Sequence, residues 1–385
     1  MFRTVLAGLV FVCSACGPLS PPKNDGGTGG GGSLFGGGTG GSGGGSGGGV
    51  TGGGTGGGTT GGGSGGGLTG GGMGGGVTGG GGGGALAPLT WASMAISGAT
   101  SSGYIIGLGG SATDLWAAQE TGYLFHSTGG AFSLAFSIQY SLKGLYASGG
   151  TVVLVQTRSI RTCTADCTNL ANYADFSLLN GTYNLFGEAV CGRGPNDITV
   201  VVSDTGNMGQ IFQWNGTTWT RTNSNLGVEY PRACWFDDAG VLYVAGQDAV
   251  ARTEMGATGI ETLSSNFTGY YGGADIAGTQ WLVGPGHYVA RRTAPNTWTR
   301  FPVTTSSTLW VVGGLSANEV YAFGYFESGV GNGFKWNGTT LAGVGNLLPN
   351  TGTQSMIRSM LITAPNELYV AGSNQAGPII IRGRR

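Results

Sequence analysis

The sequence predicts an all-β protein, a seven-bladed β-propeller preceded by a signal peptide and a disordered glycine-rich linker. Three observations lead to this prediction. A unit of about 42 residues recurs through the C-terminal part of the 385-residue chain. Each unit also contains a recurring strand and hairpin pattern, and a strand-like segment before the first unit can complete the last one.

The repeated unit begins with a polar turn, followed by a short β-branched or aromatic run that ends in a small residue. The clearest copy is Asn366 to Gly372, which resembles Asn318 to Gly324. A turn that leads into such a run is typical of the start of a β-strand. The first apolar residues of the seven copies are Leu115, Val153, Ile198, Leu242, Trp281, Val320 and Leu368.

A second element recurs between these copies. Residues 214–218 and 336–340 both read Trp-Asn-Gly-Thr-Thr. Asn-Gly between apolar runs predicts a hairpin with a type I′ turn, in which both central residues have positive φ. An apolar run with small residues, such as Ile105 to Gly109, precedes each polar turn and is expected to be the innermost strand. Each unit therefore predicts four strands, the content of one propeller blade.

Closure of the ring is predicted from the two ends of the repeat region. The last unit contains only three expected strands, the third of them at 377–382, whereas the segment Pro88 to Met94 resembles the fourth strand at 217–221. An N-terminal strand in the last blade would close the ring and leave no open sheet edge there. A β-solenoid and a two-sheet sandwich are the alternatives. Irregular spacing disfavours the first, and seven repeats disfavour the second.

The first residues have the layout of a secretory signal: one basic residue, a short apolar run, and small residues before Cys16. Residues 1–15 are therefore expected to be a lipoprotein-type signal peptide, with Cys16 as the acylated residue. Cys13 stands where Leu is usual in such signals, and cleavage after Ala15 without acylation is the alternative. We expect an exported protein of the cell envelope, anchored by lipid to the outer membrane, or else secreted or periplasmic.

Residues 16–85 are expected to be a flexible tether that joins this anchor to the domain at 86–385. Gly occupies 41 of the 59 positions from 26 to 84, with Ser and Thr as most of the others. Such a segment has too little side-chain surface to bury against the entropy cost of ordering it. Matches to the G-x-S-x-G and G-x-G-x-x-G motifs in it lack the strand and helix that those motifs require.

The repeats resemble those of a family of bacterial surface lipoproteins with degenerate propeller repeats, most of them uncharacterised. The resemblance rests on the Asn-Glu-Leu-Tyr-Val-Ala-Gly element at 366–372 and the Trp-Asn-Gly-Thr-Thr-Trp element at 214–219, and it extends over nearly all of residues 90–385. It implies the propeller fold and a location at the cell surface, and it implies no catalytic residue.

Four cysteines of the repeat region are candidates for disulfides, which exported proteins retain. Cys163 and Cys167 fall at an expected hairpin between third and fourth strands, where a disulfide would staple the turn. Cys191 and Cys234 lie on the expected innermost strands of adjacent blades. They could form a second disulfide between the blades or remain two buried thiols.

The residues give little sign of catalysis. No metal-binding or cofactor-binding motif occurs, and a net charge of −1 with scattered basic residues argues against a nucleic-acid partner. Arg193, Arg232 and Arg358 lie on or beside expected inner strands and could line the axial channel for an anionic ligand. We expect a monomeric, non-enzymatic propeller that uses no cofactor, is tethered to the membrane, and binds or scaffolds a protein or glycan. The alternative is an extracellular hydrolase or lyase with carboxylates in the channel.

One acidic position recurs in four of the units. Asp114, Asp197, Glu319 and Glu367 each stand at the end of the polar turn, just before the second strand. A catalytic residue would be unique to one blade, whereas recurrence indicates a structural role. The expected role is the bonding of turn amides.

Overall fold

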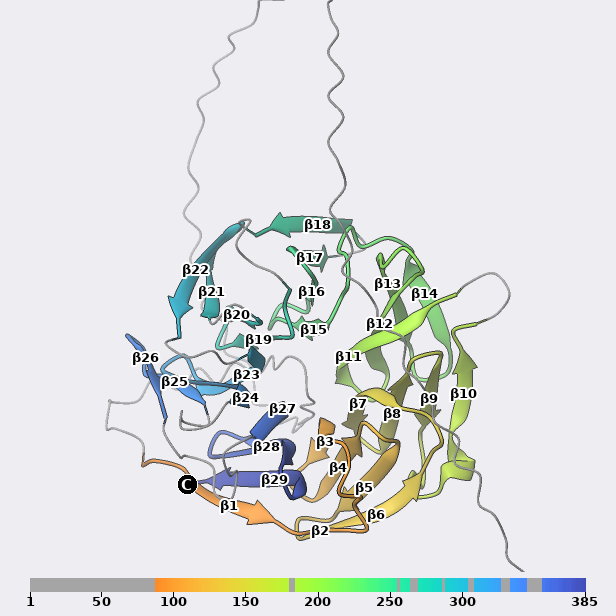
Figure 1. Ribbon diagram of the computed structural model, residues 1–385. Coiled ribbons are helices and arrows are strands. Elements are labelled where there is room, and N and C mark those ends of the chain that lie inside the picture. Colours follow the sequence, from red (N-terminus) through yellow and green to blue (C-terminus); the bar gives the residue numbers. More distant parts are fainter. Residues whose placement is uncertain are drawn as a thin grey trace, which may run out of the picture. The chain divides into compact units, whose positions relative to one another are not determined.

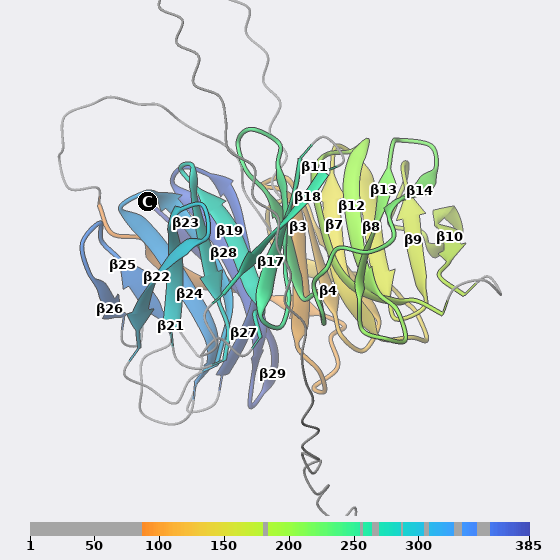
Figure 2. The same ribbon diagram turned by 90° about the horizontal axis from the view of Figure 1, so that it is seen from above.

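The computed structural model describes residues 87–179, 184–254, 257–263, 269–285, 288–303, 308–326, 333–344 and 355–385. These residues form seven antiparallel blades arranged in a ring (Figures 1 and 2). The predicted all-β propeller is therefore confirmed. Cys16, the proposed signal and the tether lie outside the described residues. Within the described ranges, no helix is long and apolar enough to cross a membrane.

Each blade runs in chain order from an inner strand to an outer strand. Blade 1 contains β3 (Ile105–Ser111), β4 (Asp114–Gln119), β5 (Tyr123–Ser127) and β6 (Phe132–Ser137). Blade 2 contains β7 (Leu142–Ser148), β8 (Thr151–Gln156), β9 (Ser159–Cys163) and β10 (Ala174–Ser177), with a 3-10 turn at Leu170–Asn172. Blade 3 contains β11 (Phe186–Gly194), β12 (Asp197–Ser203), β13 (Gly209–Trp214) and β14 (Trp219–Asn223).

Blades 4 to 6 follow the same order, whereas the outer strand of blade 7 comes from the N-terminal side of the chain. Blade 4 contains β15 (Ala233–Phe236), β16 (Leu242–Ala245), β17 (Ala249–Glu254) and β18 (Ala257–Thr262). Blade 5 contains β19 (Gly272–Ile276), β20 (Thr279–Val283), β21 (Tyr288–Ala294) and β22 (Thr297–Pro302). Blade 6 contains β23 (Thr308–Ser316), β24 (Glu319–Phe326), β25 (Phe334–Trp336) and β26 (Leu341–Gly343). Blade 7 contains β27 (Ser355–Ala364), β28 (Glu367–Asn374), β29 (Gly377–Arg384) and β1 (Thr90–Met94).

Both ends of the described chain meet in blade 7. Strand β1 pairs antiparallel with β29, with Thr90 opposite Arg384 and Met94 opposite Ile380. The chain then crosses to blade 1, where β2 (Ile96–Ser97) pairs in parallel with β6. Arg385 donates hydrogen bonds to the carbonyl of Ala87, 2.6 Å away, and to that of Pro365, 3.3 Å away. The first and last described segments are thus joined, which closes the ring.

In the described residues the core consists of seven separate hydrophobic clusters, each of which fills the space between two neighbouring blades. The cluster between blades 2 and 3 contains Tyr146 and Phe212, for example, and the cluster between blades 5 and 6 contains Trp281 and Trp336. A seventh cluster joins Phe125 of blade 1 to residues of blade 7. Because every blade buries apolar surface against both neighbours, the ring itself is the unit that is stable.

The Asn-Gly hairpins form at the predicted positions, but their turns are not of type I′. Gly216 and Gly338 have positive φ, of 96° and 99°, whereas Asn215 and Asn337 do not. The Asn side chain provides the reason. Oδ1 of Asn215 accepts hydrogen bonds from the amides of residues 217 and 218, at 3.0 and 2.9 Å, and Asn337 repeats the arrangement. Because the Asn side chain bonds these amides, the hairpin does not need the backbone geometry of a type I′ turn.

The recurring acidic position is structural, but its partners differ from those expected. Asp114 accepts from His126 at 2.8 Å and from Trp116 at 3.0 Å. Glu319 accepts from Tyr321 at 2.7 Å and from Lys335 at 3.0 Å. Glu367 likewise binds Arg382 of its own blade, and Asp197 binds Arg193. The carboxylates therefore bind a basic side chain of their own blade, and in three blades that side chain lies on the third strand. They hold the strands of one blade together rather than bonding turn amides.

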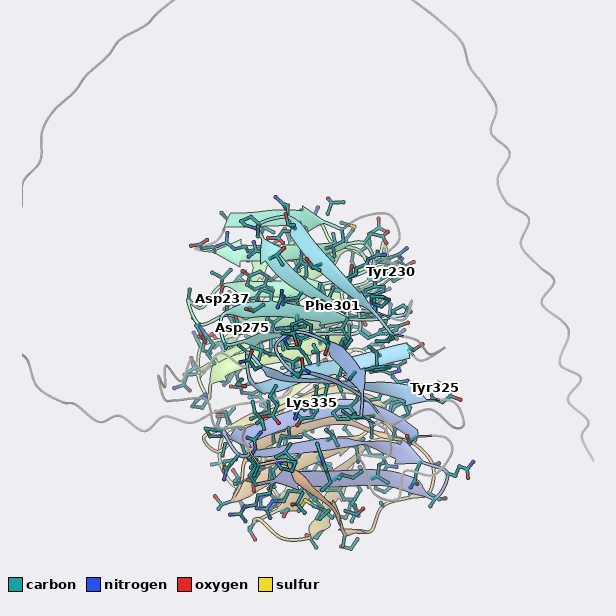
Figure 3. All side chains as sticks on the ribbon, turned by 90° about the vertical axis from the view of Figure 1, so that its left-hand side faces the viewer. Tyr230, Asp237, Asp275, Phe301, Tyr325 and Lys335 are labelled. Atoms are coloured by element: carbon teal, nitrogen blue, oxygen red, sulfur yellow. A yellow bond between two sulfur atoms is a disulfide. The ribbon has the colours of Figure 1, made fainter. Side chains whose placement is uncertain are left out.

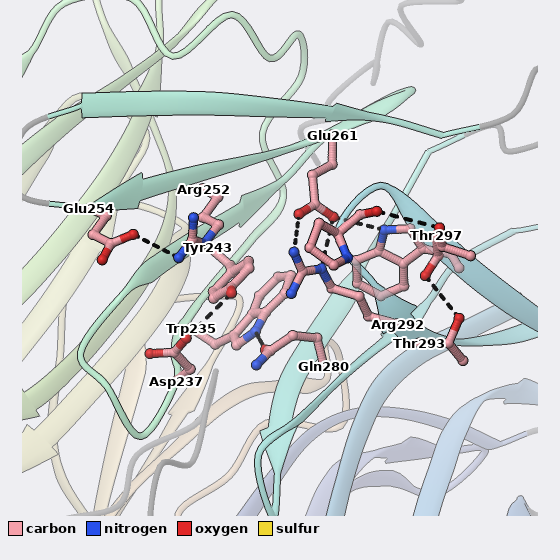
Figure 4. Close-up of polar contacts among 12 residues, drawn as sticks. Trp235, Asp237, Tyr243, Arg252, Glu254, Glu261, Gln280, Arg292, Thr293 and Thr297 are labelled. Atoms are coloured by element: carbon pink, nitrogen blue, oxygen red, sulfur yellow. Dashed lines mark hydrogen bonds and ion pairs between the residues drawn. The ribbon is translucent and has the colours of Figure 1, made fainter. Parts of the chain in front are cut away.

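Similar contacts link blade 4 to blade 5 (Figure 4). Glu261 of the outer strand β18 accepts from Arg292 at 3.0 Å and from Trp298 at 3.1 Å, both of blade 5. Deeper in the ring, the indole nitrogen of Trp235 donates to Gln280 at 2.6 Å. These bonds satisfy polar atoms that packing of the blades would otherwise bury without partners.

Candidate functional site

The inner strands share a departure from regular pairing near their first residues. Five of them contain a β-bulge there, with one extra residue between two paired ones. In blades 4 and 5 the corresponding residue directly precedes the strand, and its amide still bonds to the second strand. A bulge turns one side chain away from the sheet. The five bulged residues and the two that precede β15 and β19 all line one cavity on the axis. We call these residues the mouth ring: Ile106, Lys143, Glu188, Arg232, Tyr271, Trp310 and Arg358.

All seven mouth-ring residues line one cavity on the propeller axis, with a volume of about 140 Å³. Each is exposed or half-buried and stands between two buried neighbours, except that Val311, after Trp310, is half-buried. In six of the seven blades the residue after the mouth-ring residue is Gly, Ala or Ser, because the blades crowd the axis there. At Gly272, for instance, an added Cβ would lie 2.5 Å from the carbonyl oxygen of Trp310. A cavity of this size accepts one ring-sized or side-chain-sized group.

One half of the mouth ring, formed by blades 5, 6 and 7, is aromatic and stacked. The Tyr271 and Trp310 rings stack at 4.1 Å. The guanidinium carbon of Arg358 lies 3.6 Å from the centre of the Trp310 ring and 4.0 Å from that of Tyr104. Tyr104 directly precedes the inner strand of blade 1, so this half of the mouth ends beside Ile106. We call this set of four residues the arginine stack.

Arg358 is the most deeply placed cation of the mouth ring. Burial lowers the pKa of Arg358, although the charge of Glu120 acts in the opposite direction. Burial in the same stack raises the pKa of Tyr104. The Arg358 Nε atom donates to the thioether of Met356 at 2.9 Å, and no carboxylate of the described residues forms an ion pair with its guanidinium. The Nε1–H group of Trp310 also has no acceptor within the described ranges.

The other half of the mouth ring, in blades 2, 3 and 4, carries charge. Lys143 is exposed, and Arg232 lies 3.4 Å from Glu188 of the neighbouring blade. Glu188 also accepts from Ser203 at 2.7 Å. With three cations and one carboxylate, the mouth has an excess of positive charge that favours anionic groups.

Of the three arginines predicted for the channel, the structure places Arg232 and Arg358 in the mouth ring and Arg193 elsewhere. Arg193 is the extra residue of a second bulge, at the far end of β11. Its guanidinium binds Asp197, with 2.7 Å between Nε and Oδ2, and lies 5.0 Å from the centre of the Phe236 ring. It is not among the residues that line the cavity.

The four cysteines form two disulfides, Cys163–Cys167 and Cys191–Cys234. The first closes the connection between β9 and β10. The second joins the inner strands of blades 3 and 4, close in sequence to Glu188 and Arg232 of the mouth ring. It therefore fixes the position of the charged half of the mouth across a blade boundary.

Further aromatic side chains surround the mouth on the face where the inner strands begin. In the side view of Figure 3, Tyr230 and Tyr325 lie toward one face, and Asp237 and Asp275 lie toward the opposite face. Tyr230 precedes the Arg232 position in the loop before β15, and Tyr140 occupies the corresponding loop before β7. Their side chains are 40% and 64% exposed. Tyr230 also has a φ of 48°, which is unfavourable for a residue with a side chain. We call this side of the propeller the mouth face.

The sequence analysis did not single out Lys143, Glu188, Tyr271 or Trp310. The signal is a position at or just before the start of each inner strand that is followed by Gly, Ala or Ser in six of the seven units. It becomes visible when the seven units are aligned at their polar turns. The described residues contain no group of three or more potential metal ligands. The single described histidine, His126, is bound to Asp114 away from the mouth.

No protein-family model matches the chain, and no curated protein matches it. Several solved structures match the chain in fold. The protein named YCF48, solved bound to a D1 peptide, is 13% identical with a TM-score of 0.59, and the match covers 78% of this chain and 98% of that one. The β-propeller domain of Cps50 (Swd1) from Myceliophteria thermophila is 10% identical with a TM-score of 0.56, covering 77% of this chain and 99% of that one.

A third similar structure is the computationally designed protein Ika8, with 11% identity and a TM-score of 0.51, covering 74% of this chain and 88% of that one. At these identities the likeness is one of fold. The comparisons therefore show the β-propeller fold and do not by themselves assign a role.

Proposed function

We propose that this propeller is a non-enzymatic binding module that recognises a peptide segment of a protein ligand at its mouth face. The observation that carries the proposal is the mouth ring. Seven equivalent positions of a repeating scaffold present six kinds of side chain to one cavity, and exposed tyrosines extend the surface around it. Tyr, Trp and Arg are the residues that dominate protein-binding sites.

The likeness to YCF48, whose structure holds a D1 peptide, supports a peptide ligand in general. An extended peptide can lay its side chains over the mouth face and insert one of them into the cavity. The cavity is too small to enclose a larger ligand. Affinity then comes from aromatic contacts on the face, and specificity comes from the single inserted group.

The carboxylates of the cavity support a binding role over the alternative of hydrolysis or elimination. Two described carboxylates line it, Glu188 and Asp275. Glu188 is held by Ser203 and Arg232. Asp275 accepts from Gln280 at 2.5 Å and from the amide of Gly278 at 2.8 Å. Each carboxylate thus bonds to its own scaffold, whereas a glycosidase-type pair must face one shared bond.

Selection of peptides on the full-length protein tests the proposal. A display library of random dodecapeptides is selected on the wild type and on the variant Lys143→Ala/Arg232→Ala/Trp310→Ala. The variant Arg193→Ala/Asp197→Ala, changed on the opposite face, serves as the matched control. We expect peptides that bind the wild type and the control but lose at least about tenfold in affinity on the mouth variant. Peptides that bind all three proteins equally, or enrichment of none, would contradict the proposal.

We further propose that the chain is exported and tethered to the cell envelope through Cys16. A charged, apolar and small-residue start followed by a glycine-rich tether supports this proposal. Intact mass of the full-length protein expressed in a Gram-negative host tests it. A mature chain that begins at Cys16 with added acyl mass and partitions into membranes is expected. A soluble chain without acyl mass would rule out the anchor.

A further inference from the structure

We propose that Arg358 is the receptor for a carboxylate of the bound peptide, and that the arginine stack holds its guanidinium edge-on for this purpose. This inference rests on the proposed function, and it names the group that enters the cavity. The first observation is that Arg358 carries a positive charge without a carboxylate of the described residues bound to it. A buried cation is costly unless a counter-charge or several hydrogen bonds stabilise it. Arg358 is half-buried, and in the described residues two aromatic rings and a thioether contact it. The charge of Glu120 acts on Arg358, but no described carboxylate forms an ion pair with it.

These contacts leave the terminal N–H groups of the guanidinium for a ligand. The centres of the Trp310 and Tyr104 rings lie 3.6 and 4.0 Å from its central carbon, and Nε bonds to Met356. Two aromatic rings restrict the rotation of the side chain and leave its terminal N–H groups to donate. A fixed pair of such donors matches the two oxygens of a carboxylate. Tyr271, on the other face of Trp310, keeps the indole in place.

The other cations of the mouth ring are less suited to be this receptor. Arg232 is already paired with Glu188 and is 49% exposed, so solvent screens its charge. Lys143 is exposed and presents a mobile point charge. These two residues raise the local concentration of anions at the mouth, whereas Arg358 lies where a group inside the cavity would reach it.

The ligand group is therefore a carboxylate beside an apolar or aromatic surface, as in a peptide that contains Asp or Glu next to an aromatic residue or that ends in an aromatic residue. The unpartnered indole Nε1–H of Trp310 is a further donor in the stack. A peptide carboxylate can come from a side chain or from the C-terminus, and the two sources are separable by chemical blocking.

The probes are four hexapeptides titrated against the full-length protein by calorimetry. Acetyl-Gly-Gly-Phe-Asp-Gly-Gly-amide carries a side-chain carboxylate, and its Asn counterpart carries none. Acetyl-Gly-Gly-Gly-Gly-Gly-Phe with a free C-terminus carries a terminal carboxylate, and its amide carries none. We expect the carboxylate member of at least one pair to bind about tenfold or more tightly than its amide. That preference should vanish in Arg358→Gln, fall in Arg358→Lys, and persist in the matched control Arg193→Gln.

The results separate the role of Arg358 as carboxylate receptor from the proposal that the mouth face binds peptides. A preference that survives Arg358→Gln in a protein with unchanged thermal midpoint overturns the role of Arg358 and leaves peptide binding intact. Equal binding of acid and amide members at the mouth does the same. If no hexapeptide binds but trigalacturonate does, the cavity recognises an acidic glycan, and both the peptide ligand and this inference are wrong. If Arg358→Gln unfolds, Trp310→Ala provides the second variant, because it removes the stack and should also abolish the preference.

Discussion

The recurring acidic position and the mouth ring each occupy equivalent positions of the repeated units. They differ because the first carries the same type of residue in several units and the second does not. Asp114, Asp197, Glu319 and Glu367 share one position, and each binds a basic side chain of its own blade. The mouth ring also has one member per blade, but its seven residues are of six kinds and converge on one cavity. Repetition at equivalent positions thus marks the scaffold, and divergence at equivalent positions marks the candidate site.

Among the scaffold contacts, the disulfide between blades is expected to make the largest contribution to the free energy of unfolding. Removal of Cys191–Cys234, which closes a loop with a sequence separation of 43, should lower the free energy of unfolding by about 4 kcal/mol. The separation for Cys163–Cys167 is only 4, and its removal should cost about 2 kcal/mol. Denaturant unfolding of the two double Cys→Ala variants measures both. Equal losses would show that the longer loop closed by Cys191–Cys234 gives no more stability than the short loop closed by Cys163–Cys167.

The next largest effect is expected at the recurring acidic position. Glu319 is 5% exposed and bonds to Tyr321, Lys335 and Arg385. Burial alone would raise the pKa of Glu319, but these hydrogen bonds hold it below its usual value. Glu319→Ala should destabilise the protein by about 3 kcal/mol, because it leaves buried partners unpaired. Asp197→Ala is the control. Its pair with Arg193 is largely exposed, so the loss should stay under about 1 kcal/mol.

The buried carboxylate of the cavity gives a prediction on pH. Burial raises the pKa of Asp275 to about 6, and hydrogen bonds from Gln280 and Gly278 only partly offset that effect. The folded chain then holds a proton that the unfolded chain has released, so stability should rise as pH falls from about 7 toward 4. The gain is at most about 3 kcal/mol and is lost as pH rises through 6.

Below about pH 4 the opposite trend should appear. The pKa values of Glu319 and Glu367 lie below their usual range, so protonation of these carboxylates removes stability that is present at higher pH. Unfolding measured across this range should therefore show a maximum between pH 4 and 6. Asp275→Asn should flatten the part above the maximum. An unchanged profile in that variant would show that Asp275 titrates normally.

The smallest effect on stability is expected in the mouth ring. Arg232→Gln and Lys143→Gln should each change the free energy of unfolding by less than about 0.5 kcal/mol, because both side chains are exposed. Denaturant unfolding compares them with Glu319→Ala. A loss as large as that at Glu319 would mean that the mouth ring is also scaffold, and the comparison between the two sets of residues would fail.

Much of the fold could be predicted because its signals are local. The seven apolar residues chosen from the repeats all lie in second strands, from Leu115 in β4 to Leu368 in β28. The candidate site was predicted less completely. Arg232 and Arg358 stood out by their nearness to inner strands, but so did Arg193, which a second bulge turns outward. Bulge positions depend on pairing with the second strand, so the sequence of one strand does not show which side chain faces the axis.

Hydrogen–deuterium exchange of the full-length protein, with and without a peptide enriched on it, shows directly whether the mouth ring is the binding site. We expect protection at the start of each inner strand, in particular at residues 142–145, 231–234, 309–312 and 357–359, and no change at the opposite turns 237–241 and 317–318. Protection confined to those opposite turns, or to the outer strands, would contradict the claim that the mouth ring is the binding site.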